Sequence, residues 1–255
     1  MNLNQRAAGV LLHITSLPGP HGIGDFGPEA YRFVDWLHSA KQTLWQWLPT
    51  TPVGPGDSPY QSPSAFAGSP LMVALEPLVE RGWLDAVALP EEGFSNTRVD
   101  FPRVIPWRDG QLRRAAQGFF LRADAKERTA FTAWCQQETS WLDEYALFMA
   151  LFNAHGMKPW WEWAEPLRKR NARALAQARA QHAQETDYWR FVQWCWDEQC
   201  RALKAYANER RIARGGEVNV ELAKAPHRLS GTFHIGGQEQ FYLESQAAIA
   251  YPGEE

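Results

Sequence analysis

The sequence has neither a large net charge nor long hydrophobic runs, and each absence argues against a class of protein. A net charge of -3 over 255 residues offers no electrostatic attraction for nucleic acid or for an anionic membrane surface. No apolar run approaches the roughly 20 residues that cross a bilayer, so we expect no membrane segment. Residues 1–6 are not followed by the apolar core of a secretory signal peptide, so we expect no export by that route.

Cysteine is also scarce. The three cysteines, Cys135, Cys195 and Cys200, are odd in number and do not have the spacing of a metal site. A reducing compartment is the simplest interpretation, so we expect a cytoplasmic protein without a metal centre. The hydrophobic content of 45% is ordinary for a globular protein, and the length suffices for one large domain.

Aromatic and proline residues are abundant by contrast, and they mark one loop. Apolar residues 44–49 predict a strand, and the segment after it is stiffened by prolines at positions 52, 55, 59, 63 and 70. This loop presents Asp57, Ser58, Tyr60 and Gln61 at the end of the strand, a common place for a ligand site. Tyr60 is suited to stack on a sugar face while its hydroxyl group donates a hydrogen bond. The alternative is an ordinary proline-rich turn that binds nothing.

The amino-terminal segment predicts a strand–helix–strand unit. Residues 9–17 are nearly continuously apolar, which is typical of a strand buried on both faces in a parallel sheet. A loop at 18–27 leads to Pro28, a residue typical of a first helical turn. Apolar residues then recur with helical spacing at positions 30, 33, 34 and 37. With a second strand at 43–48 this is a βαβ unit of two adjacent parallel strands with the helix packed on them, and such units bind ligands at the carboxyl ends of their strands.

Two further polar residues lie near those strand ends. His13 falls within the first apolar run, where a hydrogen-bonded packing role is favoured over catalysis. Asp25 lies in the loop before the first helix, where capping of that helix is favoured over lining a site.

The chain becomes mainly helical after residue 71. Leu75, Leu78 and Val79 predict a short helix that ends at Gly82. Residues 90–107 contain three prolines and are expected to be irregular. Helical patterns return at 111–125 and 127–135.

The later helices carry an aromatic stripe and then a polar stretch. Aromatic and apolar residues between 141 and 152 share one helical face and predict a core contact. Pro166 begins a polar, solvent-exposed helix that extends to about residue 184. Thr186 or Asp187 is expected to cap a strong helix that extends to about residue 211. Its predicted buried face comprises Tyr188, Phe191, Val192, Cys195, Ala202 and Tyr206.

Several long blocks of sequence resemble the amylomaltases, also called 4-alpha-glucanotransferases or disproportionating enzymes. The resemblance covers about residues 6–212. Its motifs are AGVLLH at 8–13, TSLPG at 15–19, GIGD at 22–25, GDSPYQS at 56–62, SAFAG at 64–68, WLDEYALF at 141–148 and AYANER at 205–210.

The resemblance implies a TIM barrel with helical insertions that acts on α-1,4-glucans without a metal or an organic cofactor. The expected ligand is a malto-oligosaccharide or an α-glucan. Tyr60 matches the family tyrosine that stacks against the sugar beside the cleaved bond. Asp57 and Ser58 share its loop and are assigned to substrate binding.

The catalytic carboxylates of the family belong to later barrel strands. Retaining transfer requires a nucleophile and an acid/base about 5 Å apart, and no residue of this chain matches either motif. Asp25 and Asp57 have no second carboxylate placed beside them by the sequence. We therefore expect no catalytic residue here and a truncated, inactive chain that belongs to a glucan-transferring family. The alternative is a non-catalytic fragment that binds malto-oligosaccharide weakly.

The tail resembles a different family. Residues 225–244, with GGQ at 236–238 and FYLE at 241–244, are similar to the molybdenum-binding subunit of xanthine dehydrogenases. Gln238 matches a position beside the molybdenum in that family. A segment this short does not build a molybdopterin pocket, so no cofactor is expected, and a molybdenum-dependent hydroxylase is a remote alternative. We expect the tail to pack poorly on residues 1–212.

The expected fold is therefore α/β, an incomplete TIM (β/α) barrel rather than a closed one. Residues 1–73 supply the first barrel strands, their helix and the Tyr60 loop. A helical insertion follows at 74–185, then a barrel helix at 186–212 and an unrelated short tail at 213–255.

Overall fold

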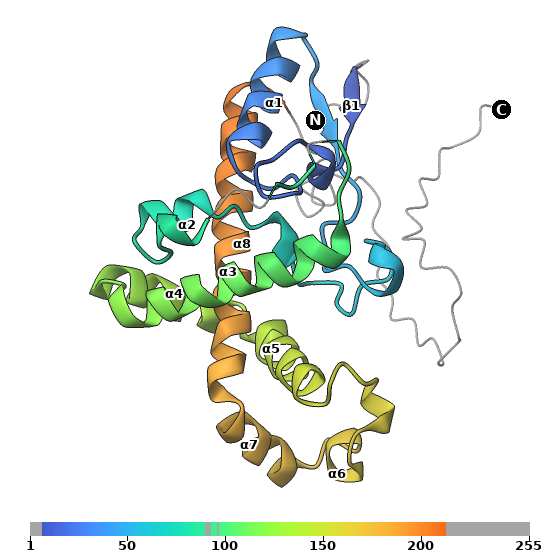
Figure 1. The fold of residues 1–255 in the computed structure, drawn as a ribbon, viewed down its shortest axis with the longest axis vertical. Helices are drawn as coiled ribbons and strands as arrows, with labels where there is room; N and C mark the ends of the chain where they lie inside the picture. The colour runs from blue at the N-terminus through green and yellow to red at the C-terminus, as the bar shows by residue number, and fades with distance from the viewer. Residues whose placement is uncertain (1–6, 90–92, 96, 213–255) are drawn as a thin grey trace, which may run out of the picture.

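The structure is a computed structural model that describes residues 7–89, 93–95 and 97–212 (Figure 1). The expectations for the tail at 213–255, including its poor packing and the role of Gln238, lie outside the described residues.

The amino-terminal unit contains two parallel strands joined by a helix. β1 (Gly9–Leu11) pairs with β2 (Leu44–Gln46), and Gly9 lies opposite Leu44. α1 (Pro28–Ser39) connects them and begins with Pro28 in its first turn. Phe33 of α1 packs edge-on against Trp45 of β2, with ring centroids 4.9 Å apart. The predicted βαβ unit is confirmed.

Both strands are shorter and more exposed than the sequence predicted. The predicted strand bounds, 9–17 and 43–48, were wrong, because a 3-10 turn, η1 (Ile14–Ser16), follows β1. The prediction that the first strand is buried on both faces was also wrong, since Leu11 is 58% exposed. Ile14 is fully buried nonetheless. Apolar residues in a buried turn and in a buried strand give the same hydropathy pattern, and among the described residues each strand has a single neighbour.

The remaining described residues are mainly helical, and the longest helix, α8, extends along most of the molecule (Figure 1). α8 packs against α1, α3, α4 and α5. The helices are α2 (Glu76–Glu80), α3 (Phe101–Arg122), α4 (Ala125–Gln137), α5 (Thr139–Ala154), α6 (Glu165–Arg168), α7 (Ala172–Gln181) and α8 (Ala183–Glu209). The short 3-10 turns are η2 (Pro55–Asp57), η3 (Pro70–Met72), η4 (Ala86–Ala88) and η5 (Trp160–Glu162).

α3 begins earlier than expected and also ends earlier. The irregular segment predicted for 90–107 is wrong from Phe101 onward, because Pro102 stands in the first turn, where an amide N–H has no intrahelical partner. Pro106 removes one helical hydrogen bond, yet Val104 and Arg108 are fully buried around it and hold the turn in place. The helix predicted over 111–125 stops at Arg122, because Asp124 forms a capping box with Glu127 and starts α4.

The polar helix predicted from Pro166 to about residue 184 is two helices. Arg170 has a positive φ of 52°, which ends α6. The side chain of Asn171 then accepts hydrogen bonds from the backbone N–H groups of Arg173 and Ala174 and begins α7.

α8 also begins before the residues expected to cap it. His182 is the N-cap residue, and the cap predicted at Thr186 or Asp187 is wrong. Thr186 is buried, and its hydroxyl group donates a hydrogen bond of 3.0 Å to the carbonyl oxygen of His182. On the predicted buried face Ala202 is exposed and Leu203 is buried instead, because this end of α8 packs through Cys200 and Leu203 into a second core shared with the βαβ unit.

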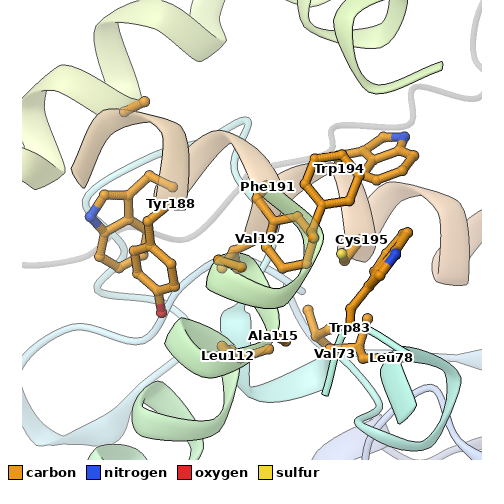
Figure 2. Packing of buried hydrophobic residues seen from close by; sticks show 14 of the residues in the cluster. Val73, Leu78, Trp83, Leu112, Ala115, Tyr188, Phe191, Val192, Trp194 and Cys195 are labelled. Atoms are coloured by element: carbon orange, nitrogen blue, oxygen red, sulfur yellow. The ribbon is translucent and has the colours of Figure 1, made fainter. Parts of the chain in front are cut away.

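Two hydrophobic cores meet along α8. In the larger one, Phe191 and Val192 of α8 pack with Leu112 of α3 and with Trp83 (Figure 2). The smaller core joins Leu203 of α8 to the βαβ unit through residues that include Ile14, Val34 and Trp45. The domain division at 73/74, 185/186 and 212/213 stays a prediction, and α8 itself crosses the second of these positions. In the part of the chain that the structure describes, no helix is long and apolar enough to cross a membrane.

Candidate functional site

A pocket of about 510 Å³ opens between the Tyr60 loop and the helices. The loop contributes residues 52–54, 57 and 61–63, and the opposite wall comes from α3, α5 and α8. That wall is mainly apolar, with Ile105, Leu112, Phe148, Met149, Phe152 and Trp189. A volume of this size is typical of a small-molecule site, for which the usual range is roughly 300–1,000 Å³.

The Tyr60 loop is held by its own hydrogen bonds as well as by proline. Gly56 and Asp57 both have positive φ angles, 74° and 57°, which makes a tight turn. The backbone N–H of Asp57 donates to the carbonyl oxygen of Gly54 at 3.1 Å, and that of Tyr60 donates to the Ser58 hydroxyl oxygen at 3.3 Å. Glycine and aspartate tolerate this left-handed region better than most residues, so the local sequence suits the turn.

The end of the loop is attached to α8 by a residue that the sequence did not reveal. The side-chain oxygen of Gln193 accepts a hydrogen bond of 2.7 Å from the backbone N–H of Gly68, and its amide nitrogen donates one of 2.9 Å to the Gly68 carbonyl. Gln193 is only 1% exposed. A Cβ atom on Gly68 would lie 2.1 Å from the ring of Trp196, so glycine is required for this close approach.

The loop residues assigned to ligand binding lie in different positions relative to the pocket. Asp57 and Gln61 line it. Tyr60 is 44% exposed on the same loop, and the hydroxyl of Ser58 shapes the turn beneath it. Tyr60 and Ser58 do not line the pocket itself, and their role in binding stays a prediction.

Arg108 lines the pocket and joins α3 to the loop before α1. It is fully buried, and its Nη2 donates to the Val73 carbonyl at 2.5 Å and to Asp25 Oδ2 at 3.1 Å. Asp25 Oδ1 accepts from the backbone N–H of Gly27 at 2.9 Å. The helix N-cap is Gly27, so the expectation that Asp25 caps α1 was wrong. Burial raises the pKa of Asp25, and the neighbouring Arg108 guanidinium opposes that rise.

His13 lies beyond β1 rather than inside a strand, as the N-cap of η1. It is buried, and among the described residues its Nδ1 has no hydrogen-bond partner. Burial lowers the pKa of the imidazole. The expected location in a strand was wrong, and the buried side chain lies just beyond the carboxyl end of β1.

The pocket lining contains two carboxylates, Asp57 and Asp109. Both carboxylate oxygens of Asp109 already have hydrogen-bond partners. Oδ1 accepts a hydrogen bond from the Tyr188 hydroxyl at 2.7 Å, and Oδ2 accepts one from Arg113 Nε at 2.7 Å. Arg113 in turn binds both oxygens of Glu185. Residues 7–89, 93–95 and 97–212 contain no group of three or more His, Cys, Asp or Glu side chains that could hold a metal ion.

The fold is that of a helix-rich α/β protein with a pocket beside the loop that follows β2, and comparison with known proteins defines it further. The sequence profile of the 4-alpha-glucanotransferases, glycoside hydrolase family 77, matches residues 12–225. The chain belongs to this family.

Known relatives support the assignment over the same region. The chain is 46% identical over 219 residues to the 4-alpha-glucanotransferase of Thermus thermophilus, which covers 86% of this chain and 43% of that protein. It resembles the solved structure of an amylomaltase from Streptococcus agalactiae in complex with acarbose, with a TM-score of 0.78 and 36% identity. That match covers 82% of this chain and 42% of the other. The chain therefore spans less than half the length of these relatives.

The carboxyl-terminal region matches two families. A molybdopterin cofactor-binding domain profile matches residues 203–255, and it overlaps the glucanotransferase match over 203–225. The match to the 4-alpha-glucanotransferase of Aquifex aeolicus, at 35% identity, covers 94% of this chain. Similarity to the glucanotransferase family thus continues beyond residue 212, where the recognisable motifs end.

Proposed function

We propose that this chain is the glucan-binding amino-terminal part of a 4-alpha-glucanotransferase and that the 255 residues alone do not transfer glucan. The observation that carries the proposal is a pocket walled by the family's Tyr60 loop. The proposal includes an incomplete barrel that contains its first strands only. It also includes a cytoplasmic location, which the scattered cysteines favour.

Binding is proposed to combine stacking with hydrogen bonds. The exposed ring of Tyr60 is available to stack on a sugar, and Asp57 and Gln61 offer polar groups at the pocket. The loop is preorganised by its internal hydrogen bonds and by Gln193, which reduces the entropy lost on binding. The acarbose complex of the Streptococcus agalactiae relative supports a malto-oligosaccharide or α-glucan as the ligand.

We infer the lack of glucan transfer from the chemistry of a reaction that retains the configuration of the anomeric carbon. One carboxylate must attack the anomeric carbon while a carboxylic acid protonates the leaving oxygen. Asp109, the other carboxylate of the pocket lining, is already bonded to Tyr188 and Arg113, so Asp57 has no uncommitted carboxylate to act with it. By resemblance the nucleophile and the acid/base belong to later strands, for which this sequence has no match.

A disproportionation assay tests this proposal. Purified chain is incubated with maltotriose, and the products are separated by chromatography. We expect no glucose and no longer maltodextrins. Products that form with this chain and disappear with Tyr60→Ala would overturn the proposal, because the loop would then support catalysis within these residues.

A molybdopterin cofactor-binding profile matches residues 203–255, and the motifs of this tail resemble the molybdenum-binding subunit of xanthine dehydrogenases, so cofactor binding is the second candidate to test. We propose that this segment holds no cofactor by itself, since it is too short to enclose one. Metal analysis of the purified chain tests this, and stoichiometric molybdenum that is lost with Gln238→Ala would contradict it.

A further inference from the structure

Two of the largest apolar side chains of the protein are left in solvent on one short turn. Trp160 is 50% exposed and Trp161 is 59% exposed, both on η5. Their ring centroids are 5.9 Å apart, and the ring planes are nearly perpendicular at 81°. A buried tryptophan removes roughly 150–250 Å² from water, so two adjacent exposed indoles form a surface that suits a ligand.

The turn that carries this pair is held in place by a buried tryptophan, Trp163. Trp163 is 7% exposed and packs against Phe148 and His155, with ring centroids at 5.5 Å and 5.1 Å. Its indole nitrogen donates to the Lys158 carbonyl at 2.9 Å, and its backbone N–H donates to the Trp160 carbonyl at 3.2 Å. The two exposed indoles therefore stand on a rigid base, which lowers the entropic cost of binding.

The same base connects the indole pair to the glucan pocket. Phe148 lines the pocket and also contacts Trp163. The turn η5 follows α5, the helix that supplies this wall, and precedes α6 (Figure 1). The helix wall of the pocket and the turn that carries the indole pair therefore share one packed cluster, which contains Phe148, Phe152 and Trp163.

We propose that Trp160 and Trp161 form an accessory platform for an α-1,4-glucan chain. The inference rests on the proposed function, because it takes the pocket to hold one end of the same polymer. The C–H faces of glucose units stack on aromatic rings, and the two indole planes, at 81° to each other, offer faces in two directions. Exposed Lys158 and Glu162 flank the pair, offer hydrogen bonds to sugar hydroxyls and have opposite charges, which suits a neutral ligand.

The platform is tested by electrophoresis of the full chain in native gels that contain amylose. We expect the double variant W160A/W161A to bind amylose about tenfold more weakly than the parent chain, because two stacking contacts are lost. Its affinity for maltotriose, measured by calorimetry, should change less than about twofold, since so short a ligand is held at the pocket. Trp36→Ala is the matched control, because Trp36 is 53% exposed on α1, at the opposite end of the molecule from α6 and α7 (Figure 1).

The outcomes separate this inference from the proposed function. Unchanged amylose retardation in W160A/W161A, together with weaker maltotriose binding in Tyr60→Ala, would overturn the platform and keep the pocket. Amylose binding that Tyr60→Ala leaves intact and W160A/W161A abolishes would support the platform and reject the pocket. The indole pair could instead contact a second copy of the chain. In that case sedimentation velocity will show self-association of the parent chain that W160A/W161A loses, while amylose binding stays unchanged. This result would also overturn the inference. W160F/W161F, which keeps two stacking rings, should retain most of the retardation.

Discussion

The side chain of Gln193 hydrogen-bonds to both the backbone N–H and the backbone carbonyl of Gly68, 125 residues earlier in the chain. Gln199, six residues further along α8, makes the same pair of contacts with Ala74, at 2.7 Å and 3.0 Å. Two glutamines of one helix therefore hold the segment that ends the Tyr60 loop. The loop depends on α8 for its position as much as on its prolines.

Gln193→Leu should lower the free energy of unfolding by about 1–3 kcal/mol, because it leaves a buried N–H and a buried carbonyl without partners. It should also weaken maltotriose binding, since the loop loses its anchor. Gln199→Leu is the matched control: it should lower stability in urea denaturation and leave binding closer to that of the parent chain. Equal binding losses in both variants would contradict a specific role for Gln193.

Two glycines should respond to alanine in opposite directions. Gly68→Ala places a Cβ atom against Trp196 and should cost about 1–3 kcal/mol of stability, as overpacking does. Gly110, inside α3, has no atom within 4 Å of the position that a Cβ would take. Gly110→Ala should therefore raise stability by about 0.5–1 kcal/mol, since glycine is a poor helix former. Thermal unfolding of both variants measures the difference, and a stable Gly68→Ala protein would show that the contact with Trp196 relaxes freely.

Arg108→Met should destabilise the protein by about 3–5 kcal/mol, because it leaves Asp25, whose side chain is only 13% exposed, without its cation. The Val73 carbonyl also loses its donor. The double variant R108M/D25N should recover part of this loss, since it removes both charges. Arg32→Ala, which removes an exposed ion pair with Glu29, should cost less than about 1 kcal/mol. An equally small effect of Arg108→Met in chemical denaturation would contradict the role assigned to the ion pair of Arg108 and Asp25.

Glu185 should make stability depend on pH in the acid range. Burial alone raises the pKa of Glu185, but hydrogen bonds from Arg113 and Asn153 outweigh it and hold the pKa below its ordinary value of 4.5. A lowered folded pKa stabilises the protein above the unfolded value, and this stabilisation is lost as the pH falls below about 4.5 through the folded pKa. Urea denaturation between pH 3 and pH 7 should show a smaller acid-induced loss for Glu185→Gln than for the parent chain. Exposed Glu80 provides the control, since Glu80→Gln removes the same charge without touching Arg113.

The βαβ unit and most helices were predictable because their signals are local. The spacing of Ala30, Val34 and Leu37 predicts α1, and all three are buried. Element boundaries were missed where tertiary packing outweighs local preference, as at Pro106, which buried Val104 and Arg108 hold inside α3. An apolar run gives no sign of where a strand becomes a turn, so Ile14 was placed in β1.

The candidate site was predictable in part. Asp57 and Gln61 were found because they share a stiff loop with Tyr60 at a strand end, and they do line the pocket. Gln193 and Arg108 were missed, since a single polar residue in a helix carries no local signal of a partner many residues away. The apolar wall from α5 was read as core, although Phe148 and Phe152 border the pocket.

The most direct test of the central claim is calorimetric titration of the full chain with acarbose and with maltotriose. The account predicts weak but measurable binding, with a dissociation constant near 1 mM, about 4 kcal/mol. Tyr60→Ala should abolish it, and Tyr60→Phe should retain the stacking part. Binding of equal strength in the parent chain and in Tyr60→Ala, or no binding to the folded parent chain, would contradict the assignment of this loop as a glucan site.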